Sequence, residues 1–316
     1  MAAEDEQAPS AVAEASTRGT DPPFGRKEVQ AIGGPTAGKA IIAPKVVGAM
    51  SRESVWTLRR ALPRRYQPPF LVALPLVIMI AWCALTLGAK PLVSPWFLPS
   101  PIAVLQATLR MVFDGTLIEH VLSSVSRIAV SFALAAAVAL PLGILMASFE
   151  PINRLFEPVM APLRYLPISA FIPLLILWFG IGELQKIAFL FLGVFVFLLP
   201  VVITAIRAVP EELVQTALTL GASRWQAIRT VLVPAALPDI FDAFRVMNAI
   251  SWTYVILAEI VNARSGLGYM INLAGIHLKI DEVFSGILVI GVIGLATDAA
   301  IRFVNGILFR WREVSP

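Results

Sequence analysis

Apolar residues in this chain form six long blocks, each separated from the next by a polar or charged stretch. Each block is close to 20 residues long, the length that an α-helix needs to cross a hydrocarbon layer of about 30 Å. The pattern therefore predicts an all-α membrane protein with six membrane-spanning helices. The predicted spans cover residues 70–88, 128–147, 156–179, 187–206, 244–261 and 283–301.

Prolines interrupt two of the predicted spans. The third contains Pro158, Pro162, Pro167 and Pro173, and the fourth contains Pro200. A proline lacks the backbone N–H and bends a helix, which a membrane protein tolerates where neighbouring helices or water satisfy the freed carbonyl groups. We therefore expect bent helices in this part of the chain.

The composition agrees with a membrane protein and excludes several other classes. Of the 316 residues, 58% are hydrophobic and 15% are charged, against about 25% charged residues in a typical soluble domain. The single cysteine, Cys83, excludes a disulfide framework, and His120 and His277 lie too far apart in sequence to suggest a metal site. The net charge of +4 is too small to suggest a nucleic-acid partner.

The first 66 residues differ from the rest. Residues 1–50 are rich in Ala, Gly, Pro, Glu and Lys and show no sustained periodicity, so we expect a disordered cytoplasmic tail rather than a signal peptide. Four arginines between residues 59 and 65 then form a basic collar before the first span, a pattern typical of the cytoplasmic side of a membrane. Residues 67–312 are predicted to form the membrane domain.

One segment of the tail resembles a nucleotide-binding motif. Residues 33–40 (GGPTAGKA) nearly match the phosphate-binding loop, whose last position is a Ser or Thr that binds Mg²⁺. Ala40 lacks that hydroxyl group, and no strand or helix pattern flanks the segment. We therefore expect no ATPase site, no cofactor and no metal in this chain.

The distribution of basic residues predicts the orientation. With a cytoplasmic amino terminus, and residues 1–50 left aside, the inner segments carry 14 basic residues: Arg52, Arg59, Arg60, Arg64, Arg65, Arg154, Arg164, Arg207, Arg224, Arg229, Arg245, Arg302, Arg310 and Arg312. The outer segments carry six: Lys90, Arg110, Arg127, Lys186, Arg264 and Lys279. Because cytoplasmic loops are enriched in Lys and Arg, both termini are predicted to be cytoplasmic.

The longest cytoplasmic connection, residues 207–242, has the pattern of two short helices around a glycine. Pro210 suits the start of a helix, Gly221 permits a positive φ, and Ser223 can cap a second helix. Taken alone, this pattern also fits an amphipathic element that lies on the lipid surface.

Here the sequence resembles a known family. Residues 215–217 (QTA), Gly221 and residues 231–234 (VLVP) are similar to the EAA loop of ABC-importer permeases, although Gln and Thr replace the first Glu and Ala of the triplet. Residues 97–101 (FLPSP), 178–182 (WFGIG) and 265–270 (SGLGYM) resemble the nitrate, sulfonate, taurine and bicarbonate branch of these permeases. The resemblance covers residues 68–312.

The resemblance implies a type I ABC-importer permease that works with two ATP-binding-cassette ATPase subunits, a second copy of the permease and an external solute-binding protein. The chain would import a small anion across a bacterial inner membrane, and the partner ATPase would bind ATP and Mg²⁺. The connecting loop would dock into a cleft of that ATPase. The implied coupling residues are Glu212, Gln215, Ala217, Gly221, Ala222, Ser223, Arg224, Trp225 and Pro234.

Polar and aromatic residues inside the spans are candidates for the translocation path, because such groups need partners in lipid. The candidates are Arg127, Ser169, Trp252, Thr253, Tyr254 and Glu259. For residues 252–254 packing against the third span is an alternative. Arg127 and Glu259 are predicted at similar depth near the outer boundary. They would form a structural pair or separate interfacial contacts, and a pair predicts that exchanging the two charges partly restores a complex lost in Arg127→Gln. Alternatively, Arg127 would provide a cationic entrance for an anion.

Two other functions remain open from the sequence. An ion-coupled secondary transporter would need intramembrane carboxylates, for which only Glu259 and Asp298 are candidates. An intramembrane enzyme would need a nucleophile with a base, or a metal site, and no such constellation is evident.

Overall fold

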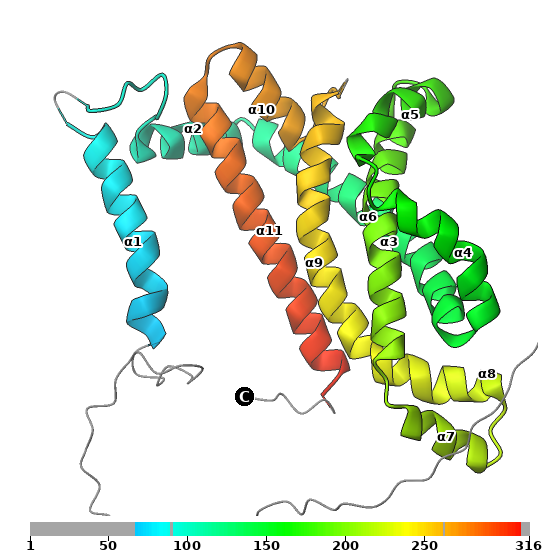
Figure 1. The fold of residues 1–316 in the computed structure, drawn as a ribbon. Helices are drawn as coiled ribbons and strands as arrows, with labels where there is room; N and C mark the ends of the chain where they lie inside the picture. Colours follow the sequence, from blue (N-terminus) through cyan, green and yellow to red (C-terminus); the bar gives the residue numbers. More distant parts are fainter. Residues whose placement is uncertain (1–66, 89–90, 262, 311–316) are drawn as a thin grey trace, which may run out of the picture. The chain divides into compact units, whose positions relative to one another are not determined.

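The computed structural model describes residues 67–88, 91–261 and 263–310. Every regular element in these ranges is helical, which confirms the prediction of an all-α protein (Figure 1). The chain divides into two units, residues 1–62 and 63–316, and the described residues all belong to the second. The predictions of a disordered tail and a basic collar, and the motif at residues 33–40, lie outside the described residues.

Among the described residues, three helices are long and apolar enough to cross a membrane: α3 (Thr116–Ser148), α6 (Glu183–Arg207) and α11 (Ile280–Leu308). A fourth crossing is formed if α4 (Glu150–Leu163) and the segment Ile168–Phe179 count as one broken span. These elements correspond to the predicted second, fourth, sixth and third spans.

The predicted third span is broken by a 92° bend rather than gently curved. Its second half consists of η1 (Ile168–Phe171) and α5 (Ile172–Phe179), with Pro167 before η1 in an extended conformation. A proline disfavours the helical conformation for the residue before it, here Leu166, and cannot donate a helical hydrogen bond. The prediction that prolines bend this span is therefore correct, but the bend is a sharp break between two helical segments.

The remaining two predicted spans correspond to α1 (Gln67–Thr86) and α9 (Val233–Ile260). The described side chains of α1 begin at Val72, which leaves an apolar helix too short to count as a span. α9 is long enough, but its charged residues, such as Arg245 and Glu259, make it too polar to count by the same measure. The count of six spans therefore stays a prediction.

Two helices and the start of a third were not predicted. They are α2 (Pro101–Phe113), α10 (Leu267–Ile276) and the first turns of α3, which begins well before residue 128. Ser100 caps α2, because its side chain accepts a hydrogen bond from the Ala103 N–H at 3.2 Å.

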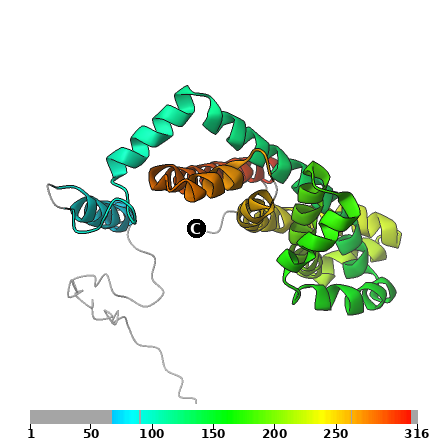
Figure 2. The ribbon, with the colours of Figure 1, turned by 90° about the horizontal axis from the view of Figure 1, so that it is seen from above.

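The core lies where α3, α6 and α9 pack together, with α10 and α11 against α9. Figure 2 shows α9 between the α10–α11 pair and α6. Close helix approach depends on small residues: a Cβ at Gly143 would lie 2.7 Å from Val202 Cγ1, and one at Gly193 would lie 3.0 Å from the Tyr254 ring. This packing fixes the ends of α3, α6 and α9 relative to one another, and those ends carry the charged site described next.

Candidate functional site

A largely buried cluster of charged and polar side chains joins α3, α6, α9 and the turn before α10. We call it the Arg127 cluster; its members are Ser124, Arg127, Glu183, Lys186, Glu259 and Ser265. It lies in the first half of α3, at the start of α6 and at the end of α9.

Arg127 is the centre of the cluster and uses all five of its N–H donors. Its Nε and Nη2 atoms donate to the two carboxylate oxygens of Glu183 at 2.6 and 2.8 Å. Its Nη1 atom donates to Glu259 at 2.7 Å and to the carbonyl oxygen of Ser265 at 2.8 Å. The fifth bond runs from Nη2 to Ser265 Oγ at 3.1 Å. The side chain is only 4% exposed, so these bonds replace its hydration.

Glu259 is the fully buried anion of the cluster. Besides the Arg127 bond, its carboxylate accepts hydrogen bonds from Ser124 Oγ at 2.8 and 2.9 Å and from the Gly268 N–H at 2.8 Å. A buried carboxylate is costly unless it is both paired and hydrogen-bonded, and Glu259 meets both conditions.

The turn before α10 is shaped around Glu259. Gly266 has φ +117°, and a Cβ there would lie 2.3 Å from the Glu259 carboxyl carbon. A Cβ at Gly268 would lie 2.6 Å from the carbonyl oxygen of Ile256. The backbone N–H groups of Gly266 and Leu267 donate to His120 Nδ1 and Ser124 Oγ, at 3.2 and 2.9 Å. The glycines at 266 and 268 are therefore needed for close approach of this backbone to a buried carboxylate.

The structure brings two of the predicted path residues, Arg127 and Glu259, into direct contact and separates the others from them. Ser169 is exposed in η1. Thr253 is exposed on α9, and its hydroxyl donates to the carbonyl oxygen of Ala249 at 3.4 Å.

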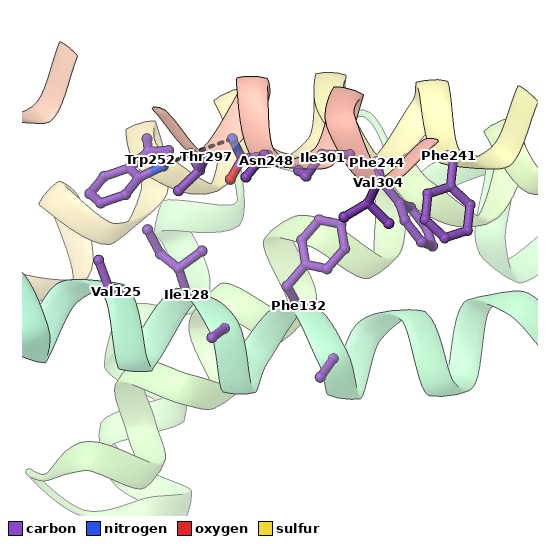
Figure 3. A pocket seen from close by; sticks show the side chains of 13 residues that line it. Val125, Ile128, Phe132, Phe241, Phe244, Asn248, Trp252, Thr297, Ile301 and Val304 are labelled. Carbon is purple, nitrogen blue, oxygen red and sulfur yellow. Dashed lines mark hydrogen bonds between the residues drawn. The ribbon is translucent and has the colours of Figure 1, made fainter. Parts of the chain in front are cut away.

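Tyr254 and Trp252 pack against helices other than those expected. The Tyr254 ring meets Phe189 of α6 edge-on, with 5.8 Å between centroids. Trp252 is buried, and its Nε1 donates to Thr297 Oγ1 of α11 at 3.3 Å. Trp252 also lines a pocket of about 410 Å³ between α3, α9 and α11 (Figure 3).

This pocket is apolar. Asn248 and Thr297, hydrogen-bonded at 2.9 Å, are polar members of its lining, and none of the lining residues is charged. Figure 3 shows Phe132 of α3 facing Phe241 and Phe244 of α9 across the pocket. Such a lining provides no charged group for binding an anion.

A second polar region, at the opposite ends of α6 and α9, consists of α7 (Glu211–Thr219) and α8 (Arg224–Ala227) and the turn between them, which we call the α7–α8 loop (Figure 1). Pro210 lies one residue before the first helical residue. Gly221 has φ +89°. The N–H groups of Gly221 and Ala222 donate to the carbonyl oxygens of Leu218 and Ala217, both at 3.0 Å, which is a Schellman motif.

Ser223 and Gln226 form a capping box at the start of α8, with bonds of 3.3 and 2.8 Å. The second helix does not end near residue 230 as expected. It continues through a π turn (Ile228–Leu232) into α9, so no separate segment leads to residue 242.

The α7–α8 loop is solvent-facing and partly apolar. No residue of α7 is buried, Leu220 is 83% exposed, and Trp225 is 52% exposed. Of the expected coupling residues, Ala217, Ala222 and Pro234 are half-buried. The exposed ones are Glu212, Gln215, Gly221, Ser223, Arg224 and Trp225.

Four members of the Arg127 cluster were not predicted from the sequence. Ser124 and Ser265 look like ordinary helix-boundary residues, and Glu183 and Lys186 look like the polar start of a span. The run of residues 265–270 was noticed as a family feature. Gly266 and Gly268 in this run were the one feature of the local sequence that indicated close approach of the backbone to other groups.

Comparison with known proteins gives consistent matches. Residues 139–312, more than half of the chain, match the family described as the binding-protein-dependent transport system inner membrane component. The taurine transport system permease protein TauC of Escherichia coli (strain K12) is 32% identical over 240 residues, which cover 74% of this chain and 86% of TauC. The aliphatic sulfonates transport permease protein SsuC of Bacillus subtilis (strain 168) is 35% identical over 243 residues, covering 76% of this chain and 86% of SsuC.

A solved structure of the MetNI methionine ABC transporter in an inward-facing conformation has the same fold. It matches with a TM-score of 0.52 and 22% identity, over 62% of this chain and 98% of that chain. The family consists of membrane components of ABC importers, in which ATP hydrolysis belongs to a separate subunit. On the family match and the two relatives above 30% identity, this chain belongs to the binding-protein-dependent transport system inner membrane components.

Proposed function

We propose that this chain is the permease subunit of an ATP-driven importer for a small anion of the sulfonate or taurine type, with nitrate and bicarbonate as related candidates. The observation that carries the proposal is the similarity to TauC and SsuC over about three quarters of the chain. Both relatives are named for sulfonate-bearing solutes.

The α7–α8 loop is proposed to dock on the partner ATPase, which binds the ATP and Mg²⁺. A Schellman motif and a capping box at its turn make the loop rigid, and a rigid element transmits displacement whereas a flexible one does not. Its exposed Leu220 and Trp225 provide the apolar contact area that a protein partner would cover. Closure of two ATPases would then drive alternating access between inward-facing and outward-facing states.

The complete transporter is proposed to contain a second copy of this permease and an external solute-binding protein, in the lipid of a bacterial inner membrane. Because the α7–α8 loop and the Arg127 cluster lie at opposite ends of α6 and α9, they would face opposite sides of the membrane. With both termini cytoplasmic, the α7–α8 loop faces the ATPase and the Arg127 cluster faces the binding protein.

An ion-coupled secondary transporter fits the structure less well. Its two candidate coupling carboxylates are both ion-paired: Glu259 with Arg127, and Asp298 with Arg245 at 2.9 Å and with Arg302. A carboxylate held in this way is not free to take up and release a coupling ion without breaking its pair.

The basic test is isolation of the tagged chain from its native host. We expect an ABC ATPase to copurify, and we expect ATP-dependent uptake of taurine or methanesulfonate by vesicles that contain the complex and a binding protein. ATP-independent uptake driven by an ion gradient would contradict the proposal and support the secondary transporter.

Substituting Gly221 by valine tests the docking function of the α7–α8 loop. A β-branched side chain is disfavoured at φ +89°, so the turn should distort at a cost of about 1–3 kcal/mol. We expect the variant to insert normally but to lose ATPase copurification and uptake. Quantification of the ATPase in pulldowns, together with uptake rates, measures the effect.

Gly115→Val is the matched control. Gly115 also has a positive φ, +76°, and at both positions no atom lies within 4 Å of an added Cβ, but Gly115 lies between α2 and α3, away from the α7–α8 loop. It should retain ATPase association despite similar strain. Full uptake by Gly221→Val, or equal loss of association in both variants, would exclude the loop as the docking element.

A further inference from the structure

The charged members of the Arg127 cluster differ sharply in exposure. The side chains of Arg127 and Lys186 are each 4% exposed and that of Glu259 is 0% exposed, whereas that of Glu183 is 58% exposed. Glu183 nevertheless pairs with both buried cations, at 2.6 Å to Arg127 and 3.0 Å to Lys186. An exposed carboxylate therefore covers two buried positive charges.

We propose that Arg127 and Lys186 form an oxyanion-binding site, that the Glu183 carboxylate occupies this site in the present structure, and that a small sulfonate or carboxylate monoanion takes its place during transport. The choice of ligand rests on the proposed function, whereas the site itself rests on the contacts of the cluster.

The donor geometry suits an oxyanion. Arg127 presents Nε and Nη2 side by side to the two oxygens of Glu183, and Lys186 Nζ donates to Oε1 of the same carboxylate. Such a fork binds any group with two coplanar acceptor oxygens, and a sulfonate presents the same edge together with a third oxygen. A bound sulfonate would therefore accept the same three hydrogen bonds that Glu183 accepts now.

The balance of positive and negative side chains in the cluster predicts a ligand with a single negative charge. Glu259 neutralises one of the two cations and has no route to solvent, since it is fully buried and held by Ser124 and the Gly268 N–H. The remaining positive charge is matched by Glu183. Because an unpaired buried charge is costly, the site must hold either the Glu183 carboxylate or an anion that replaces it.

Glu183 is placed to leave the site. It is the first residue of α6, and its side chain already faces solvent over more than half of its surface. Rotation of the side chain about its own bonds would take the carboxylate into water and restore its hydration.

The test compares Glu183→Gln with Glu119→Gln in the full chain, purified with its ATPase. Glu119 is an exposed carboxylate in the first turn of α3, just as Glu183 lies in the first turn of α6. Replacing Glu119 by glutamine therefore makes the same change in charge at the N-terminal end of a helix, but outside the Arg127 cluster. Thermal melting is measured in sodium methanesulfonate and in sodium chloride at equal ionic strength. We expect methanesulfonate to raise the midpoint of Glu183→Gln by about 2–4 °C over chloride. Wild type and Glu119→Gln should show a smaller difference, because Glu183 competes for the site.

Equal responses of the two variants, or equal effects of methanesulfonate and chloride, would overturn the proposal. If Glu183→Gln does not fold, Glu183→Asp serves instead: its shorter carboxylate covers the site less well, and no excess response over wild type would again reject the site. A midpoint raised only by added phosphatidylglycerol would identify a lipid head group and reject a soluble anion. A variant that copurifies with ATPase yet ignores methanesulfonate rejects this inference alone, whereas absence of ATPase from the wild-type preparation rejects the proposed function.

Discussion

Substitution of Arg127 by glutamine is expected to remove most of the folded protein from the membrane. Glutamine cannot replace five N–H donors, and it leaves the fully buried Glu259 carboxylate without its cation. Removing one partner of a buried ion pair typically costs about 3–5 kcal/mol, which is a large part of the stability of a domain. The yield of monodisperse protein after detergent extraction measures the loss.

Arg154→Gln is the control for this change, because Arg154 pairs with Glu150 on the exposed side of α4, where both side chains are more than half exposed. Its yield should be close to that of the wild type. Equal yields of Arg127→Gln and Arg154→Gln would show that the Arg127 cluster does not contribute to folding.

The structure also changes the expected result of exchanging the two charges. Arg127→Glu together with Glu259→Arg should not restore the folded complex. A glutamate at position 127 would face Glu183, and an arginine at 259 would meet the N–H donor of Gly268 and the Ser124 hydroxyl in a space that holds a carboxylate. The simple pair inferred from sequence is one contact of a larger network.

Replacing Gly266 by alanine should be nearly as damaging. The added Cβ would lie within 2.3–2.5 Å of the carboxyl carbon and both oxygens of Glu259, which the Ser124 hydroxyl, Arg127 and the Gly268 N–H hold in place. The positive φ of +117° adds strain of about 1–3 kcal/mol, and overpacking adds a similar amount. We expect a strongly lowered melting midpoint and little extractable protein.

The control is Gly291→Ala in α11, where no atom lies within 4 Å of the added Cβ. Alanine is favoured over glycine in a helix by about 1 kcal/mol, so this variant should be as stable as the wild type or slightly more stable. A normal midpoint for Gly266→Ala would mean that the turn before α10 does not approach Glu259 as closely as the structure indicates.

Much of the fold follows from hydropathy alone. The fourth predicted span, residues 187–206, lies within α6, because nearly every residue in it is apolar and lipid accepts no other regular structure of that length. The helices α2 and α10 escaped prediction because each is too short to cross a membrane, and α3 was shortened because its first turns contain polar residues such as Glu119 and His120.

The site was predictable only in part. Arg127 and Glu259 stood out as charges close to an apolar boundary, and their contact follows from similar depth. Glu183 did not stand out, because an acidic residue in the first turn of a helix is already explained by the helix dipole. Its pairing with Arg127 depends on how α3 and α6 pack, and no local pattern encodes that.

The π turn between α8 and α9 affects the direction in which the α7–α8 loop points relative to α9. From Arg224 to Ile260 the backbone stays helical, and only Ile228–Leu232 is wound more loosely. A π turn acts as an inserted residue, and each residue of an α-helix turns the chain by about 100° and advances it by about 1.5 Å. Because the looser winding of the π turn takes up the extra residue, deleting one residue from it would leave Trp225 facing nearly the same way, whereas deleting one residue from the regular part of α9 would turn Trp225 by about 100° around the helix axis. The direction in which the exposed apolar surface points is thus maintained by the π turn, which lets the stretch between Ser223 and Val233 hold one residue more than a regular α-helix would.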